Sequence, residues 1–404
     1  MVLLHCTLVL QIGVLMPEGR SIFSQLIDYF PYRAFQSGVE KYHGDRRIRS
    51  FRCWEQLLVL AFAQLTSQES LRDIETGLRS LHSRLYHMGF RGTIARSTLA
   101  DANENRDWRI YQEFAWHLIA HARQLYCDEP NIVELAETVY AFDSTMIDLC
   151  LSLFPWAQYQ PTAAAVKMHT LLDLRGSIPS FILITDGTMH DVRGLDYLPI
   201  EPGAYYVMDR GYLDFARLYR FTTGGAFFVV RAKKTLRFVR CQSREIDTAT
   251  DLRADQTIRL CYAESARKYP APLRRVTFRN PNNGKRVVLL TNQFILSAKT
   301  IVELYRSRWQ IETFFRWIKQ NMRIKAFYGT SENAVKTQIW TAIAVYTVIA
   351  IVKKELNLTQ SMHELTTIIK LNIAEKLPLV RLCSDISKVL SNDDQNKQLC
   401  LLNF

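Results

Sequence analysis

The 404-residue sequence predicts an α/β protein in which a helical N-terminal region precedes a mixed sheet with flanking helices. Apolar residues in 20–126 recur with helical spacing. From residue 137, short runs of β-branched and aromatic residues alternate with helical segments, which is typical of a mixed sheet. Residues 231–286 lack helical spacing and contain short alternating runs, so we expect a β-rich insertion there. The hydrophobic content of 48% excludes a disordered chain.

In the N-terminal region, helices are expected at 21–30, 51–66, 68–80 and 107–126. The stretch 92–105 resembles the turn and entry of a helix-turn-helix, and an ordinary helical bundle explains it equally well. We therefore assign 20–126 as a helical DNA-binding domain. The first fifteen residues are apolar without a preceding Lys or Arg, so a signal peptide is not expected. Residues 1–19 are expected to be flexible or an over-extended start, with Met16 as an alternative start.

The sheet is predicted to begin with strands at 137–149, 169–173, 180–185 and 205–208, followed by a helix at 213–221 and a strand at 226–230. These elements form the first half of a catalytic core, 137–230. The insertion 231–286 contains a Pro-Asn-Asn-Gly turn at 281–284, and a strand at 286–291 then returns to the main sheet. The second half of the core is assigned to 287–350 and a C-terminal helical region to 351–404. The apolar run 339–352 is shorter than the ~20 residues of a membrane span, which predicts a buried helix.

Charge and cysteine usage narrow the class of partner and the compartment. The net charge is +12, and residues 231–286 hold 15 Lys or Arg against 5 Asp or Glu, a net of 15 − 5 = +10. A second basic cluster, opposed only by Asp45, consists of Lys41, Arg46, Arg47, Arg49 and Arg52. This uneven placement favours a polyanionic partner, most simply nucleic acid, over a merely basic protein. The eight cysteines include no Cys-x-x-Cys, which indicates neither a zinc site nor a disulfide framework and fits a reducing cytosol.

The segment 305–319 is the most informative for function. On one continuous helix, Tyr305, Arg308, Glu312 and Lys319 would fall within about 60° of one another. The apolar side of that helix would pack against the core through Leu304, Ile311, Phe314, Phe315 and Ile318, and its Trp and Phe residues are expected in the core rather than stacked on bases. One carboxylate between two cations and a phenol suits a phosphate-bearing substrate around a metal ion.

Two aspartates near strand ends extend this interpretation. Asp143 lies in Ala-Phe-Asp-Ser-Thr, and Asp209 directly follows the strand 205–208. With Glu312 they could form a three-carboxylate site for two Mg²⁺ ions roughly 3.5–4 Å apart, acting on a phosphodiester. The residues alone leave alternatives open. A strand-end Asp is more often a turn or cap residue, and a helical Glu usually faces solvent. The same role could fall to Asp148, Asp173, Asp186, Asp191 or Asp196.

The order Asp143, then Asp209-Arg210-Gly211-Tyr212, then Tyr305, Arg308, Glu312 and Lys319 resembles the DDE transposases of bacterial insertion sequences. Within them it is similar to the IS-four family, whose signature is this Tyr-Arg-Glu-Lys spacing. The resemblance covers roughly 137–350, and the helical N-terminus is similar to the N-terminal domain of one branch of that family. It implies a ribonuclease H-like core with Asp143, Asp209 and Glu312 as ligands of two Mg²⁺ ions, for which Mn²⁺ can substitute.

The resemblance also implies partners and a location. DNA phosphates would be contacted by Tyr305, Arg308 and Lys319 at the signature positions, and we add Arg210, Lys233, Lys234, Arg274 and Arg275 from the charge pattern. The expected substrate is double-stranded DNA, namely terminal inverted repeats and target, bound by a homodimer on the nucleoid in the cytoplasm. Some relatives form a DNA hairpin assisted by a Trp in the insertion, and 231–286 contains none. Two alternatives remain: an inactive DNA-binding relic, and a ribonuclease H-like nuclease without strand transfer.

Overall fold

The computed structural model describes residues 19–130, 135–247, 250–281, 283–321 and 327–384. The chain forms two compact units, one of residues 126–316 and one of residues 1–125 with 317–404. The expectations for 1–18 and 385–404 lie outside the described residues. Each unit is described by itself.

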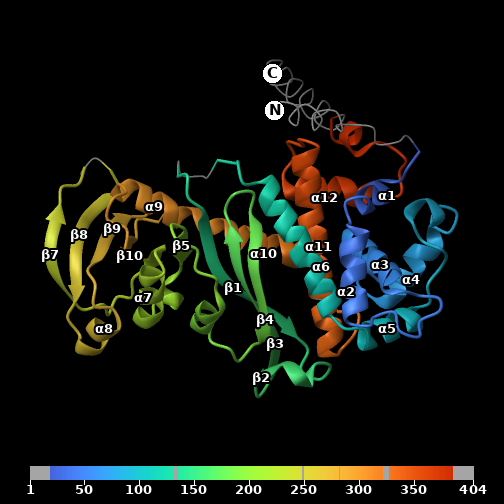
Figure 1. Ribbon diagram of the computed structural model, residues 1–404, viewed down its shortest axis with the longest axis horizontal. Coiled ribbons are helices and arrows are strands. Elements are labelled where there is room, and N and C mark those ends of the chain that lie inside the picture. The colour runs from blue at the N-terminus through green and yellow to red at the C-terminus, as the bar shows by residue number, and fades with distance from the viewer. Residues whose placement is uncertain (1–18, 131–134, 248–249, 282, 322–326, 385–404) are drawn as a thin grey trace, which may run out of the picture. The chain divides into compact units, whose positions relative to one another are not determined.

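The unit 126–316 is built on one mixed sheet whose first five strands run in the order β4-β3-β1-β5-β6. β1 pairs antiparallel with β3 and parallel with β5, and β5 pairs parallel with β6. The bounds are β1 Val139–Leu149, β3 Ala163–Asp173, β4 Ile178–Asp186, β5 Tyr205–Met208 and β6 Phe227–Arg231, with the short β2 Gln158–Gln160 beside β3. Three antiparallel strands followed by two parallel ones confirm the predicted ribonuclease H-like sheet (Figure 1).

The insertion continues this same sheet rather than forming a sheet of its own. β10 (Arg286–Thr291) pairs antiparallel with β6, and β9 (Leu273–Arg279), β8 (Leu252–Leu260) and β7 (Phe238–Arg244) follow in that order. Figure 1 shows these four strands side by side at one end of the sheet. The turn after β9 has Gly284 in the left-handed region, with φ 65°. One short helix, α8 (Ala263–Lys268), interrupts the predicted β-rich segment.

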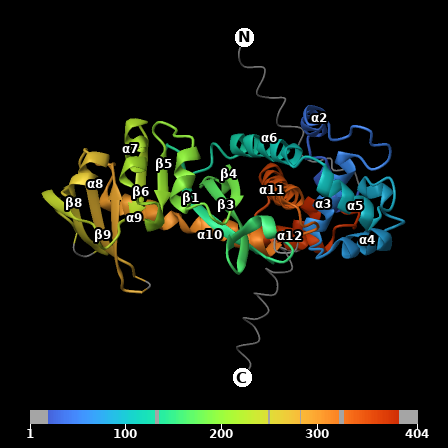
Figure 2. The ribbon, with the colours of Figure 1, turned by 90° about the horizontal axis from the view of Figure 1, so that it is seen from below.

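Helices cover both faces of the sheet. α7 (Phe215–Thr223) connects β5 to β6 and buries Leu218 and Phe221 in a cluster with Tyr206 and Met208. α9 (Ala298–Ser307) contacts β5, β6, β8 and β9, and in Figure 2 it lies on the other side of the strands from α7. Because side chains alternate along a strand, residues next to Met208 face α9 instead. That face carries the predicted site residues Asp143 and Asp209.

The other unit is helical. Its N-terminal helices are α1 (Ile22–Ile27), α2 (Tyr32–Lys41), α3 (Cys53–Leu65), α4 (Leu71–Ser80), α5 (Arg96–Asn105) and α6 (Arg109–Leu125), and α12 (Met362–Leu371) lies near its end. The predicted helices at 21–30, 51–66, 68–80 and 107–126 correspond to four of these. α2 and α5 were not predicted as separate helices, because their apolar faces are short and interrupted by polar residues.

α11 (Glu332–Glu355) packs in the helical unit, although its sequence falls largely within the predicted second half of the core. We assigned residues up to 350 to the catalytic core, whereas α11 packs on α6 and α3 in the helical unit. The helix is apolar on all sides, so its sequence gives no preferred partner. By length and composition it could cross a membrane, yet 94% of its apolar window is buried in the protein. It is therefore the core helix of this unit, as the sequence predicted for 339–352.

Candidate active site

Strand register places the two predicted aspartates next to each other. β1 and β5 are parallel neighbours in which Phe142 is opposite Met208. Asp143 and Asp209 each come one residue later, where the β1–β5 pairing ends, and on the face opposite the α7 cluster; β1 itself continues to Leu149. The two carboxylates also interact electrostatically, because the negative charge of Asp209 contributes to raising the pKa of Asp143.

The helix predicted over 305–319 is two helices, α9 and α10 (Trp309–Asn321), that meet at Arg308. At the junction the amide of Arg308 bonds the carbonyl of Tyr305, and the amide of Ile311 bonds that of Arg308, so the bonds span three residues. The buried Ser307 hydroxyl also donates to the Leu304 carbonyl, a contact that bends helices. Arg308 keeps a helical backbone, with φ −53° and ψ −28°, so the polar stripe survives the break.

Asp143 is a partly buried carboxylate that is held by three donors. Its Oδ1 accepts hydrogen bonds from the Ser144 amide at 2.9 Å and from the Tyr212 hydroxyl at 3.3 Å. Its Oδ2 accepts from Arg308 Nη1 at 3.1 Å. Burial raises the pKa of Asp143 above its ordinary value, although these three donors oppose that rise. The ionised form of a buried carboxylate with a raised pKa is stabilised by a further positive charge nearby.

Asp209 and Glu312 are tied to the same helices. The Tyr305 hydroxyl donates to Asp209 Oδ1 at 3.1 Å, and Arg308 Nη2 donates to Glu312 Oε1 at 2.5 Å. Burial and the Asp209 carboxylate raise the pKa of Tyr305, so its hydroxyl stays protonated and able to donate. Arg308 therefore bridges Asp143 and Glu312, and the structure brings together the three carboxylates, Tyr305 and Arg308.

The position of Lys319 relative to the carboxylates follows from the helix that carries it. It lies on α10 seven residues after Glu312, which is close to two helical turns, and its side chain is half-buried. The apolar side of the segment is buried as predicted, at Leu304, Ile311, Phe314, Phe315 and Ile318. Trp309 differs from the prediction, because 57% of it is exposed.

The competing aspartates have other tasks. Asp173 pairs with Arg175, Asp196 pairs with Arg217 and Arg220, and Asp186 accepts from the amide of Thr188 in a turn. Asp191 accepts from the Ser144 hydroxyl at 2.7 Å and pairs with the buried Lys167 at 3.0 Å. Asp148 is exposed at the far end of β1. The strand register brings Asp143 and Asp209 together, which spacing alone could not predict.

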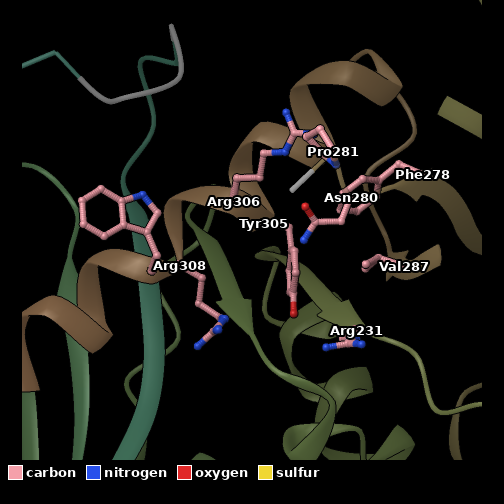
Figure 3. A pocket seen from close by; sticks show the side chains of 9 residues that line it. Arg231, Phe278, Asn280, Pro281, Val287, Tyr305, Arg306 and Arg308 are labelled. Carbon is pink, nitrogen blue, oxygen red and sulfur yellow. The ribbon is translucent and has the colours of Figure 1, made fainter. Parts of the chain in front are cut away.

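Two cavities extend from these residues across the insertion. One of about 590 Å³ is lined by Tyr305, Arg306, Arg308, Trp309, Phe278 and Arg231, among others (Figure 3). In Figure 3 the Tyr305 side chain extends towards Arg231. A second cavity of about 340 Å³ is lined by Arg210, Arg231, Lys233, Lys234, Arg275 and Arg286. Arg231 lines both cavities, but strand register places them on opposite faces of the sheet: Val287 and Phe278 line the first on the α9 side, and Val288 and Arg286 line the second on the α7 side. We call the second cavity the basic groove.

The structure corrects one predicted DNA contact. Arg274 is only 2% exposed, and its guanidinium pairs with the buried Asp255 at 2.8 Å. It also donates to the Leu296 carbonyl, so it holds the insertion together and is not available to DNA. Arg275 is buried below the second cavity, over the ring of Phe238 and bonded to Gln256. Burial, with the nearby Arg286, lowers the pKa of Arg275, which marks a crowded positive site.

Sequence reasoning missed several residues of this region. Tyr212 is buried, and its hydroxyl links the turn after Asp209 to Asp143. Its position three residues after Asp209 in the Asp-Arg-Gly-Tyr motif was the available signal. Arg231 lines both cavities, Arg306 lines the first and Arg286 lines the second, and only their place in basic segments pointed to them.

The carboxylates are suited to a divalent cation by their chemistry, since Mg²⁺ and Mn²⁺ prefer carboxylate oxygens. In the part of the chain that the structure describes, no three His, Cys, Asp or Glu side chains are grouped closely enough to hold a metal. Arg308 lies between Asp143 and Glu312 instead. The donor set fits such an ion, provided that Glu312 exchanges its bond to Arg308 for one to metal.

The sequence is similar to those of known proteins. The model of the transposase DDE domain family matches residues 134–348, and a domain of unknown function (DUF4372) matches 18–91. A protein of Sinorhizobium fredii (strain NBRC 101917 / NGR234) named as transposase y4zB is 33% identical over 275 residues, covering 67% of this chain and 75% of the relative. A Geobacillus stearothermophilus protein named as a transposase for insertion sequence element IS5377 is 32% identical over 206 residues, covering 50% and 54%.

A solved structure of piggyBac transposase in a synaptic complex with hairpin DNA aligns with a TM-score of 0.48 at 12% identity, covering 89% of this chain and 81% of that one. The family assignment rests on the sequence matches. The DDE domain spans more than half of the chain, and a relative one third identical spans two thirds of it. DDE transposase domains generally use divalent metal ions. The chain belongs to the DDE transposases of insertion sequences, enzymes that cleave and transfer DNA strands.

Proposed function

We propose that this transposase binds the terminal inverted repeats of its element, cleaves the ends by Mg²⁺-dependent hydrolysis, and joins the freed 3′-hydroxyl to target DNA. One observation carries the proposal: Asp143, Asp209 and Glu312 are gathered by hydrogen bonds from Tyr305 and Arg308. A nuclease needs only the carboxylates. The basic groove, which shares Arg231 with the cavity beside Tyr305 and Arg308, provides a surface for holding a cut end in place for a second reaction.

In this proposal the three carboxylates are the ligands of two Mg²⁺ ions, for which Mn²⁺ can substitute. Bound metal supplies activation of a water or 3′-hydroxyl and stabilisation of the leaving oxygen. Asp143 and Asp209 are fixed by rigid strands, so they set the position of the site. Glu312, whose side chain is 53% exposed, is the ligand with freedom to adjust.

Tyr305 and Arg308 hold the substrate phosphate. A planar guanidinium binds phosphate oxygens through paired hydrogen bonds, and its positive charge lowers the energy of the charged transition state. Arg308 is well placed for this task, because its ion pairs with Glu312 and Asp143 keep its pKa high although burial opposes this. Lys319 adds a further cation along the same helix side. These residues orient the phosphate, and the carboxylates direct the attack.

The DNA passes from Tyr305 and Arg308 over Arg231, which lines both cavities, to the basic groove of the insertion. Its cations are Arg231, Arg210, Lys233 and Lys234, with Arg286 at the far end. The substrate is double-stranded DNA, so the protein acts at the nucleoid in the cytoplasm. We propose that it works as a homodimer on two DNA ends, each protomer presenting this groove.

The test compares carboxylate variants with a matched control. Asp143→Asn, Asp209→Asn and Glu312→Gln should each lower end cleavage at least a thousandfold and leave end binding, measured by fluorescence anisotropy, within threefold. Asp148→Asn removes an exposed carboxylate from the same strand and should cleave normally. Cleavage within tenfold of wild type by any of the three would remove that residue from the site. Pre-cleaved ends that are never joined to target DNA would favour the simple nuclease.

A further inference from the structure

A buried lysine lies on the face of the sheet opposite the carboxylates. Lys167 of β3 is three residues before Thr170, the partner of Asp143, so the two side chains point to opposite faces. Lys167 is only 7% exposed, and its ammonium group donates to the Met189 carbonyl at 2.7 Å and pairs with Asp191 Oδ1 at 3.0 Å. Burying a cation costs desolvation energy that one ion pair rarely repays, and an apolar residue of similar volume often stabilises as well. Stability alone therefore does not explain Lys167.

Asp191 connects this lysine to the strand that carries Asp143. The Asp191 Oδ1 atom that pairs with Lys167 also accepts a hydrogen bond from the Ser144 hydroxyl at 2.7 Å. Ser144 belongs to β1 and lies opposite His169 of β3, on the same face as Lys167. One carboxylate oxygen thus binds side chains from two neighbouring strands of the sheet.

The segment that carries Asp191 is held against this face by close packing. Asp191 begins the 3-10 helix η3 (Asp191–Tyr197). A Cβ atom on Gly194 would lie 2.9 Å from Phe142 Cζ and 3.0 Å from His169 Nδ1, so the backbone of η3 lies directly on β1 and β3. Because η3 has little room to move there, Asp191 is held in a defined position.

Ser144 connects this fixed position to Asp143. The Ser144 amide donates to Asp143 Oδ1 at 2.9 Å, which is the shortest of the three hydrogen bonds that Asp143 accepts. The pairing of β1 with β5 ends at Phe142, so at Asp143 the strand pairs with β3 but no longer with β5. The side-chain bond from Ser144 to Asp191 supports β1 at the point where this neighbour is lost.

We propose that Ser144, Asp191 and Lys167 form a positioning network for Asp143, in which the ion pair fixes Ser144 and the Ser144 amide orients the carboxylate. The three side chains act from the opposite face of the sheet, so they are positioning residues and not catalytic ones. The proposal rests on the proposed function, in which Asp143 is a metal ligand. Groups that orient a metal ligand typically contribute about 10–100-fold to metal affinity.

The experiment measures Mn²⁺ binding to the full-length protein without DNA, through the signal of free Mn²⁺ in electron paramagnetic resonance. Ser144→Ala removes the hydroxyl and keeps the amide, and Asp191→Ala removes the acceptor. Asp143→Asn is the reference for loss of the ligand itself. The matched control is Asp196→Ala, which removes the ion pair with Arg217 from the same 3-10 helix.

We expect Ser144→Ala and Asp191→Ala to weaken Mn²⁺ binding about tenfold, and Asp196→Ala to bind Mn²⁺ as wild type does. Ser144→Thr keeps a hydroxyl and should retain wild-type affinity. In Ser144→Ala, the Mg²⁺ concentration for half-maximal end cleavage should rise by a similar factor, while affinity for end DNA, measured by anisotropy, stays unchanged. If the network only stabilised the fold, the amount of active protein would fall and this Mg²⁺ concentration would not move.

A double variant separates positioning from stability. Asp191→Ala alone leaves Lys167 buried without its counter-ion, which lowers the melting temperature. Lys167→Met with Asp191→Ala removes both charges, so its melting temperature should return towards that of wild type while its Mn²⁺ affinity stays low. Recovery of Mn²⁺ affinity together with stability, an equal loss in Asp196→Ala, or a loss confined to Asp143→Asn would overturn the proposal. Wild-type Mn²⁺ affinity in Asp143→Asn would instead contradict the proposed function, because Asp143 would then not be a metal ligand.

Discussion

At the scale of single residues, the site depends on side chains that position the carboxylates as much as on the carboxylates. The turn Asp209-Arg210-Gly211-Tyr212 leaves β5 and returns, so the Tyr212 hydroxyl reaches Asp143 on the neighbouring strand. The Tyr212 ring packs on Phe142, which precedes Asp143. Burial raises the pKa of Tyr212 well above its ordinary value, which keeps the hydroxyl as a donor. Tyr212 therefore fixes the orientation of one carboxylate from the turn that bears the other.

Tyr212→Phe should weaken metal binding about tenfold, because a misoriented Asp143 is a poorer ligand and a hydrogen bond to a charged group contributes about 1.5–3 kcal/mol. Binding of Mn²⁺ to the protein, followed by electron paramagnetic resonance, measures this without activity. The control is Tyr206→Phe, which removes a buried hydroxyl from the same core cluster. That hydroxyl donates to the Pro199 carbonyl at 2.8 Å. The control should lower the melting temperature and leave Mn²⁺ affinity unchanged; equal affinity in both variants would show that Tyr212 only stabilises the fold.

At the scale of elements, the local sequence pattern predicted strands and helices well, but it predicted less well which elements pair or pack with one another. The strands around Asp143 and Asp209 were evident from β-branched and aromatic runs, and pairing register, which the sequence does not state, then placed the two side chains together. Arg308 was predicted inside one helix, because the helical wheel cannot register the bonds of Ser307 and Arg308 that divide it. Arg274 was predicted to contact DNA, because a basic sequence does not reveal that Asp255 on the next strand faces it.

The correction at Arg274 predicts a stability effect. Arg274→Met leaves Asp255 buried with only the half-exposed Arg244 at 3.3 Å, so unfolding free energy should fall by about 3–5 kcal/mol. Arg259→Met, at an exposed position on β8, should change it by less than about 0.5 kcal/mol. Urea unfolding monitored by circular dichroism gives both values. The double variant Arg274→Met with Asp255→Leu should recover much of the loss; no recovery would mean that the ion pair is not the cause.

At the scale of the whole molecule, charge is placed where the fold does not need it. The segment 231–286 carries a net charge of +10, and part of it lines the basic groove. Arg275 shows the consequence, since burial and the neighbouring Arg286 lower its pKa. Such crowding is tolerated when the surface serves an anion. The positive charge excess was evident from the sequence. In the structure, Arg274 pairs with Asp255 and holds neighbouring strands together, whereas several other cations of the segment line the groove.

This division sharpens the prediction for the insertion. Lys233, Lys234 and Arg286 line the groove and are exposed, and none of them takes part in the ion pairs of the described part of the insertion. Their joint replacement by Gln should leave the melting temperature unchanged or raise it, because like charges are removed. The same variant should form fewer paired-end complexes, because each DNA end loses about three phosphate contacts. The slope of log affinity against log salt concentration should become shallower by about 0.9 for each lost contact.

The measurement is a native-gel assay of two labelled DNA ends held by the protein at physiological salt, with cleavage followed in the same samples. The matched control replaces three exposed arginines of the insertion, Arg240, Arg253 and Arg259, by Gln, which removes equal charge from positions that do not line the groove. A groove that grips DNA requires the first variant to fail in assembly while the second succeeds. If both assemble and cleave paired ends as wild type does, the positive charge of the insertion is a solvated surface, and the DNA must be held by Tyr305, Arg308 and the helical unit alone.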